Sequence, residues 1–166
     1  REGISLYHPA RFILVGTMNP EEGRLRPQIL DRFGLCVEIA ALTDPNDRLE
    51  VIRRRKEFDR DCWTFEERFA DQQEQLTQEI TAAQLLLGDV DESDEVLEQI
   101  VTITGSLGIR THRADIVMEK TAAAIAALAG RKTLERQDVI DAALLALPHR
   151  LRQKPFSGFF KRQNVI

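Results

Sequence analysis

One asparagine and two arginines stand where their side chains can meet a charged ligand. Asn19 follows the apolar run of residues 11–16, and ligands of open α/β sheets bind at the carboxyl ends of strands. Its amide offers both an acceptor and a donor, which suits the orientation of a water molecule. Asn19 also precedes a proline. Because asparagine–proline pairs favour turns, a plain turn residue is the alternative.

The two arginines lie beside predicted helix ends. Arg32 ends a short helix, where its planar guanidinium can face a phosphate with Asp31 as a neighbouring acid. A surface ion pair between Asp31 and a nearby arginine is the alternative. Arg113, with Arg110 shortly before it, lies in the first turn of another predicted helix, where the helix dipole favours acids. This placement indicates an arginine that serves an anion, and a solvated arginine is the alternative.

Other kinds of site find no support in the sequence. The motifs G-x-x-x-x-G-K-[ST] and G-x-G-x-x-G do not occur, so the chain by itself cannot cradle a triphosphate. Nothing supports a Ser-His-Asp arrangement. The basic run of residues 53–56 spreads around a helix beside acids, which favours a solvated face over a nucleic-acid patch. We expect no metal site, because no metal-ligand spacing connects the three histidines, His8, His112 and His149.

The composition is ordinary for a soluble globular protein, with 30% charged and 43% hydrophobic residues. The net charge of -4 argues against a general nucleic-acid binder. Cys36 and Cys62 match no metal or redox spacing and are expected to be reduced thiols of a cytoplasmic protein. No run of about 18 apolar residues predicts a membrane span. The first residues lack an initiator methionine and a signal peptide, so an internal start is expected.

Residues 1–43 predict the end of an α/β domain. The apolar runs 11–16 and 35–39 are typical of buried strands in a mostly parallel sheet. A helix over 26–33, with Pro27 in its first turn, separates them. Two strands cannot bury both faces of a sheet alone, so this part needs partner strands that the sequence does not contain.

Residues 44–148 carry helix signals only, and we expect a helical bundle there. Asp44 is the predicted N-cap of a first helix that reaches about residue 57. Further helices are expected over 64–87, from a cap at Ser93, and over 112–129.

The last predicted helix begins after a cap at Thr133 and ends before Pro148. A basic tail follows over residues 149–166. The expected apolar face of this helix repeats at helical spacing and comprises Ile140, Ala143, Leu144 and Leu147.

Residues 8–34 closely resemble the ATPase subunit of magnesium chelatase, a member of the AAA+ class. The order in residues 19–34 is long and specific: N-P-E-E-G-R-L-R-P-Q-I-L-D-R-F-G. Residues 108–115, G-I-R-T-H-R-A-D, resemble the start of a lid helix in the same family. The chain departs from the family pattern at Met18 and Arg24. The resemblance implies the end of an AAA+ α/β core followed by a helical lid.

The resemblance also implies roles for the residues that could bind a charged ligand. Asn19 matches the sensor-1 asparagine at a strand end, and Arg32 matches the arginine finger. Arg113 matches the sensor-2 arginine of the lid, with Arg110 as the second candidate. In such a family Arg32 reaches the nucleotide of a neighbouring subunit, while Asn19 and Arg113 act in their own subunit.

The implied activity is an ATPase that uses ATP with Mg²⁺ and forms a homo-oligomeric ring, with other chelatase subunits as partners. It couples ATP hydrolysis to magnesium insertion into a porphyrin. The present chain alone is expected to bind ATP weakly or not at all and to be inactive. Two alternatives are a MoxR-type AAA+ ATPase that remodels other proteins and, for this chain by itself, a non-catalytic helical interaction module.

Overall fold

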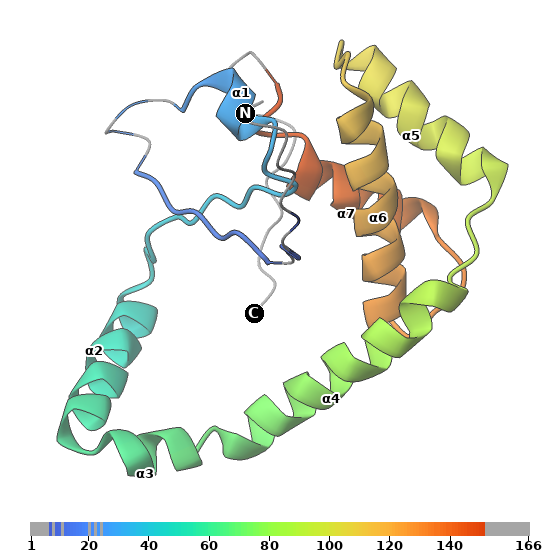
Figure 1. Cartoon of the computed structure of the whole chain (residues 1–166). Coiled ribbons are helices and arrows are strands. Elements are labelled where there is room, and N and C mark those ends of the chain that lie inside the picture. Colours follow the sequence, from blue (N-terminus) through green and yellow to red (C-terminus); the bar gives the residue numbers. More distant parts are fainter. Residues whose placement is uncertain are drawn as a thin grey trace.

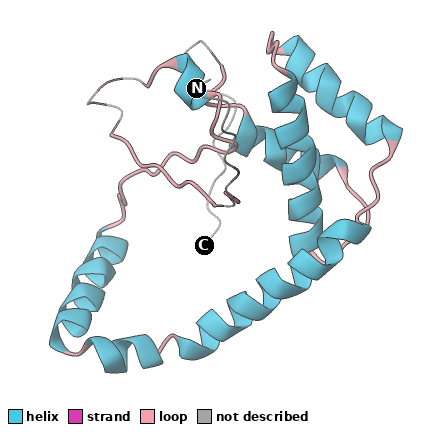
Figure 2. Ribbon diagram, viewed as in Figure 1, coloured by secondary structure: helices cyan, strands magenta, loops and turns pink. Residues whose placement is uncertain are grey.

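The computed structural model describes residues 7, 9–10, 12–19, 21, 23 and 25–151 (Figure 1). Of the predicted basic tail, only residues 149–151 fall within this range, and Arg24 lies outside it. The described elements are helical (Figure 2). In chain order they are α1 (Pro27–Leu30), α2 (Pro45–Arg60), α3 (Cys62–Glu67), α4 (Ala70–Leu86), the 3₁₀ turn η2 (Leu87–Asp89), α5 (Asp94–Ser106), α6 (His112–Leu128) and α7 (Arg136–Ala146).

The two predicted strands are wrong for this chain as it stands. Residues 12–16 and 35–39 have no regular secondary structure, and their apolar side chains, such as Ile13 and Ile39, are exposed. An extended segment becomes a strand only when a neighbour accepts and donates its ladder hydrogen bonds. No such neighbour is present among the described residues, so the α/β part of the predicted fold class is not seen in them, whereas the helical part is.

The predicted helix starts are mostly found. Asp44 caps α2, with Oδ1 accepting from the backbone N–H of Asn46 at 2.6 Å, and Pro45 is the first helical residue. The predicted helix over 26–33 is shorter, because α1 ends at Leu30. The predicted helix over 64–87 is interrupted, because α3 ends at Glu67 and α4 begins at Ala70.

The predicted cap at Thr133 is wrong. Thr133 forms an isolated parallel bridge with Asp91 instead. Glu135 is the N-cap of α7, and it forms a capping box with Asp138, whose Oδ2 accepts from the Glu135 N–H at 2.8 Å. Asp138 also accepts two hydrogen bonds from Arg131, at 2.8 and 2.6 Å. These contacts fix the turn between α6 and α7.

The core lies where α5 and α7 pack on α6. Helix α6 is rich in alanine, and small side chains let its neighbours approach closely. Of the predicted apolar face of this last helical segment, Leu147 is buried, whereas Ile140 is exposed and the buried residues of α7 include Val139, Ala142 and Ala146. Both stripes are apolar, so the sequence pattern alone cannot separate them. The buried cluster comprises Val96, Ile100, Ala114, Met118, Ala122, Val139, Ala142, Ala146 and Leu147.

Helices α2 to α4 form an arm that extends from this core (Figure 1). Neither α2 nor α3 contains a buried residue, and α4 contains only Ala83. The predicted bundle over 44–148 is therefore built, in the described residues, from the C-terminal end of α4 together with α5, α6 and α7. Among the helices that the structure describes, none is long and apolar enough to cross a membrane.

Candidate functional site

The turn after α1, residues 31–34, docks on the C-terminal end of α7. It continues from the helix through two backbone hydrogen bonds, from Arg32 N–H to Ile29 O at 3.0 Å and from Phe33 N–H to Leu30 O at 3.1 Å. Just beyond it, the Cys36 N–H donates to Leu145 O at 2.8 Å. The segment that carries Arg32 is thus attached to the last helix.

Arg150 forms the centre of this attachment. Its side chain is only 3% exposed. It donates to Phe33 O at 2.9 Å, to Gly34 O at 3.0 Å and to Asp31 O at 3.4 Å. A further hydrogen bond to Ala146 O caps the end of α7. Burial lowers the pKa of Arg150, and the Asp31 carboxylate, 3.5 Å from Nε, opposes that effect.

His149 contacts the same turn. Its Nε2 lies 3.0 Å from Phe33 O and 2.7 Å from Nη1 of Arg150. A ring nitrogen either donates or accepts, so only one of these contacts is a hydrogen bond at a given time. Burial and the adjacent Arg150 charge lower the pKa of His149, so the ring is neutral at neutral pH.

Arg113 reaches the turn from the start of α6. Its Nη1 donates to Asp31 O at 3.2 Å and lies 3.4 Å from the Asp31 carboxylate. Asp31 therefore faces two arginines, Arg113 and Arg150. Arg113 keeps 52% of its side chain exposed, so several of its N–H donors remain accessible to a ligand. The sequence left open whether Arg113 serves an anion or is solvated. In the structure it contacts the carboxylate of Asp31 and is also half-exposed.

Arg32 differs from these two arginines. Its side chain is exposed and has no hydrogen bond or ion pair to another described residue. Asp31, the neighbouring acid, is engaged by Arg113 and Arg150 instead. Arg110 is likewise exposed. The turn is therefore held firmly by its backbone, while the Arg32 guanidinium stays available.

Asn19 does not contact the docked turn within the described part of the chain. Its Oδ1 accepts from the Glu21 N–H at 3.2 Å, which is the turn geometry that asparagine favours. The preceding segment touches the docked turn at Gly16, where an added Cβ would lie 3.2 Å from Cζ of Phe33. Within the described part of the chain, no contact joins Asn19 to Arg32 or Arg113. The structure brings Asp31, Arg32 and Arg113 together, and places only the start of the Asn19 loop beside them.

Sequence reasoning missed His149 and Arg150. The sequence predicts both only as the beginning of a basic tail. One available signal was their position directly after the last helix, where cations are favoured at the carbonyl end of the helix dipole. The partners of Arg150 in the docked turn lie 116 to 119 positions earlier in the chain, however, and sequence spacing does not reveal them.

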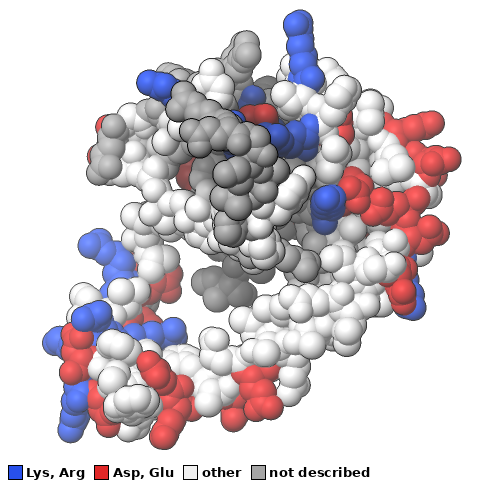
Figure 3. Space-filling model, viewed as in Figure 1, with Lys and Arg blue, Asp and Glu red and all other residues white. Residues whose placement is uncertain are grey.

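Elsewhere, the described residues form no comparable arrangement of arginines around a turn. Acidic side chains gather over α5, while the arm formed by α2 and α3 carries both signs intermixed (Figure 3). In α2, Arg54 pairs with Glu50 and Arg55 with Asp59, which agrees with a solvated face. The described residues contain no group of three or more side chains that could hold a metal ion.

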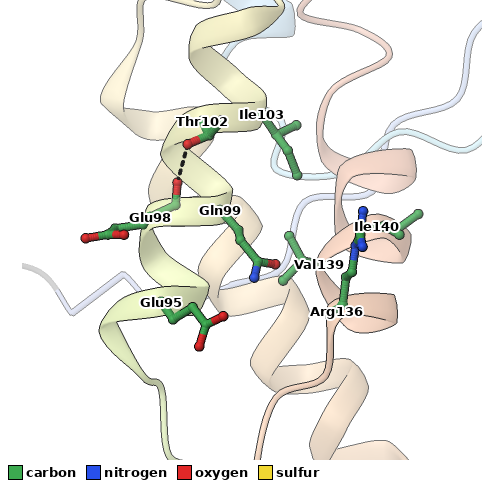
Figure 4. A pocket seen from close by; sticks show the side chains of 8 residues that line it. All are labelled: Glu95, Glu98, Gln99, Thr102, Ile103, Arg136, Val139 and Ile140. Atoms are coloured by element: carbon green, nitrogen blue, oxygen red, sulfur yellow. Dashed lines mark hydrogen bonds between the residues drawn. The ribbon is translucent and has the colours of Figure 1, made fainter.

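A groove between α5 and α7 lies away from the docked turn (Figure 4). Glu95 and Glu98 project from α5 on one side, and Arg136 stands on α7 on the other. None of the residues predicted to bind a ligand lines this groove.

Comparisons with known proteins agree with the resemblance seen in the sequence. Residues 97–164 match the AAA lid domain family. A "Magnesium-chelatase subunit ChlI homolog" of Methanocaldococcus jannaschii is 53% identical over 156 residues, which is 94% of this chain and 43% of the relative. The "Magnesium-chelatase 38 kDa subunit" of Chlorobaculum parvum is 46% identical over 93% of this chain and 45% of its own length.

A third relative, the "Magnesium-chelatase subunit ChlI" of Cyanophora paradoxa, is 44% identical over 99% of this chain and 48% of its own length. The chain thus spans less than half the length of each of these three relatives. Nearly the whole of this chain, by contrast, is covered by the similarity.

Proposed function

We propose that this chain, a homologue of magnesium-chelatase ChlI subunits, serves in an AAA+ ATPase subunit that couples ATP hydrolysis to magnesium insertion into a porphyrin. One observation carries the proposal. An exposed arginine, Arg32, which pairs with no other described residue, stands on a turn whose backbone is fixed by a buried arginine, Arg150. An arginine presented in this way is suited to an anion supplied from outside the chain.

The ligand that fits these side chains is the phosphate end of ATP. Transfer of a phosphoryl group depends mostly on positioning and on stabilising negative charge, and an arginine finger contributes about 10³–10⁵ in rate. Arg32 supplies such a charge, and Arg113 adds a second through the N–H groups that Asp31 does not engage. Asn19 would orient the attacking water, and Arg110 is the second candidate for the role of Arg113. Mg²⁺ with ATP would neutralise charge on the phosphates.

The proposal includes a ring of identical subunits. Arg32 would contact the nucleotide of the neighbouring subunit, while Arg113 and Asn19 would act on the nucleotide of their own. The phosphate-binding loop that cradles the triphosphate would lie in sequence that accompanies this chain in a longer protein. ATP hydrolysis in the ring would drive conformational changes in other chelatase subunits bound to it.

The test is the substitution Arg32→Ala in a protein that carries this chain together with a phosphate-binding loop. ATP binding should stay within about twofold, and the hydrolysis rate should fall by about 10³-fold, because a finger stabilises the transition state more than the ground state. Arg32→Lys should not restore the full rate, since an ammonium lacks the planar fork of donors. Unchanged hydrolysis in Arg32→Ala would reject the proposal.

A matched control is the substitution Arg53→Ala. Arg53 is an exposed arginine on α2, away from the docked turn. Its loss should leave both ATP binding and hydrolysis unchanged. The isolated chain of 166 residues should bind ATP weakly or not at all in isothermal titration. The backbone amides that hold the β- and γ-phosphates belong to a phosphate-binding loop, whose motif this sequence does not contain.

A further inference from the structure

We infer that Arg150 is a positioning residue for Arg32, and that through it the lid sets the direction in which the proposed finger points. This inference rests on the proposed function, because it assigns Arg150 a role in the action of Arg32. It concerns a residue that none of the sequence motifs marked.

The acceptors of Arg150 flank Arg32 on both sides. On one side Arg150 donates to Asp31 O, and on the other to Phe33 O and Gly34 O. The Arg32 side chain takes no part in these bonds and remains exposed. Arg150 therefore fixes the backbone immediately before and after Arg32 and leaves its guanidinium free to meet a ligand.

Capping of α7 alone does not account for this arrangement. Of the backbone carbonyls that Arg150 reaches, only Ala146 O belongs to α7, and three belong to the docked turn. Its side chain is almost fully buried at 3% exposure, so these bonds are made where water does not compete. Arg113 approaches the same turn from the start of α6 through Asp31. Two elements of the lid thus converge on residues 31–34.

A lysine cannot reproduce the contact. The guanidinium spreads its donors over a rigid plane, so Nη2 reaches Asp31 O and Phe33 O while Nη1 reaches Gly34 O and Ala146 O. A lysine has a single ammonium at one point in space. Arg150→Lys keeps the charge and most of the length of the side chain, and it loses the simultaneous hold on the turn around Arg32 and on the end of α7.

The lid connection has a consequence for the ring. Arg150 follows α7 directly, so a shift of α5, α6 and α7 relative to the rest of the subunit moves the backbone around Arg32 as well. In the proposed ring that backbone faces the neighbour. The conformation of the lid in one subunit would thereby change the position of Arg32 at the nucleotide of the next subunit.

The experiment compares Arg150→Lys, Arg32→Ala and the double variant in the protein that carries this chain with a phosphate-binding loop. Arg150→Lys should lower kcat about 10- to 100-fold, the effect expected of a misplacement of about 1 Å, with KM for ATP within about twofold. In the Arg32→Ala background the same change should lower kcat no further, because Arg150 acts through Arg32. Arg136→Lys, a control on the exposed side of α7, should be neutral.

The outcomes separate the two proposals. If Arg32→Ala hydrolyses ATP normally, the proposed function fails. If Arg32→Ala loses activity while Arg150→Lys keeps it, or if the two lesions add in the double variant, the positioning role of Arg150 is overturned. Rates are normalised to the folded fraction measured by circular dichroism. If Arg150→Lys does not fold, His149→Gln, which removes the ring nitrogen beside Phe33 O and keeps Arg150, is tested by the same comparison with Arg32→Ala.

Discussion

Arg113 and Asp31 are in contact across 82 positions of sequence, with Nη1 of the arginine 3.4 Å from Oδ2 of the aspartate. The contact ties the first turn of α6 to the residue that precedes Arg32. Of the two arginines predicted from sequence, Arg113 is therefore connected to Asp31 by its side chain, and Arg32 is the next residue along the backbone. In the proposed ring, Arg32 contacts the nucleotide of the neighbouring subunit and Arg113 that of its own.

Mixed rings test this assignment. Arg32→Ala subunits mixed with subunits that lack the lysine of the phosphate-binding loop should regain part of the ATPase activity. The reason is that an intact finger can then face an intact loop across the interface. Arg113→Ala subunits in the same mixture should regain none, because both lesions affect the subunit's own nucleotide. Equal recovery in both mixtures would show that Arg113, through its connection to Asp31, also serves the neighbour's nucleotide.

Hydrogen exchange should divide the chain into protected and unprotected parts. Amides near Ile140–Leu147 should exchange slowly, because α7 packs in the buried core, and amides near Phe12–Val15 should exchange fast, since they have no ladder partner. The measurement is mass spectrometry on the chain of 166 residues. Equal protection in the two regions would contradict the structure. In a longer protein that supplies neighbouring strands, protection of Phe12–Val15 should rise.

The ion pair between Arg131 and Asp138 should contribute to stability. Asp138→Asn leaves Arg131 with the exposed Glu135, 3.7 Å away, as its charged partner, and the free energy of unfolding should fall by about 2–4 kcal/mol. Asp89→Asn is the control. It breaks the exposed pair with Lys132, 2.9 Å apart, and should cost less than about 0.5 kcal/mol. Urea unfolding measures both, and equal losses would refute the distinction.

The same pair predicts a pH dependence. Hydrogen bonds from Arg131 lower the pKa of Asp138. Because the folded pKa lies below the unfolded one, the contribution is complete above about pH 4 and is lost as the pH falls further, through the folded pKa. The difference between the original protein and Asp138→Asn should therefore shrink in acid. A difference that stays constant down to pH 2 would argue against this account.

Glu119 should give the free energy of unfolding the opposite dependence on pH. Burial, with Glu92 as a second cause, raises its pKa to about 7. Between its ordinary value of 4.5 and about 7 the folded state binds more protons than the unfolded state, so stability decreases as the pH rises. Glu119→Gln removes that decrease and should raise Tm more at pH 8 than at pH 5. Equal changes of Tm at both values would contradict the raised pKa.

Local signals in the sequence predicted much of the helical part. The N-cap at Asp44 and the helix from His112 are where the sequence places them, since caps and glycine stops act within a few residues. The two strands were wrong for this chain, because a strand depends on neighbours that the sequence does not supply. The start of α7 was misplaced because Asp138 forms its capping box with Glu135, two positions beyond Thr133.

The candidate site was predictable only as separate residues. Arg32 and Arg113 stood out through motif and placement, but their relation depends on Asp31, whose contact with Arg113 crosses most of the chain. Arg150 carries no local motif, and its importance comes from burial and from backbone carbonyls that any residue can offer. Backbone partners of this kind cannot be predicted from residue type, and they are identified only from the fold.

The arm of α2 to α4 can act as a lever on the helical core of this chain. Helix α4 has 17 residues, so at 1.5 Å each it spans about 25 Å between the core and the corner with α3. A tilt of about 10° at the η2 end displaces the far end by about 4 Å, a motion that a rigid helix transmits without distortion. Since α2 and α3 contain no buried residue, no packing of these two helices on the core, in the part of the chain that the structure describes, opposes such a tilt. A force applied at the tip therefore reaches the α4–α6 contact as torque, in the same helical unit that holds the turn bearing Arg32.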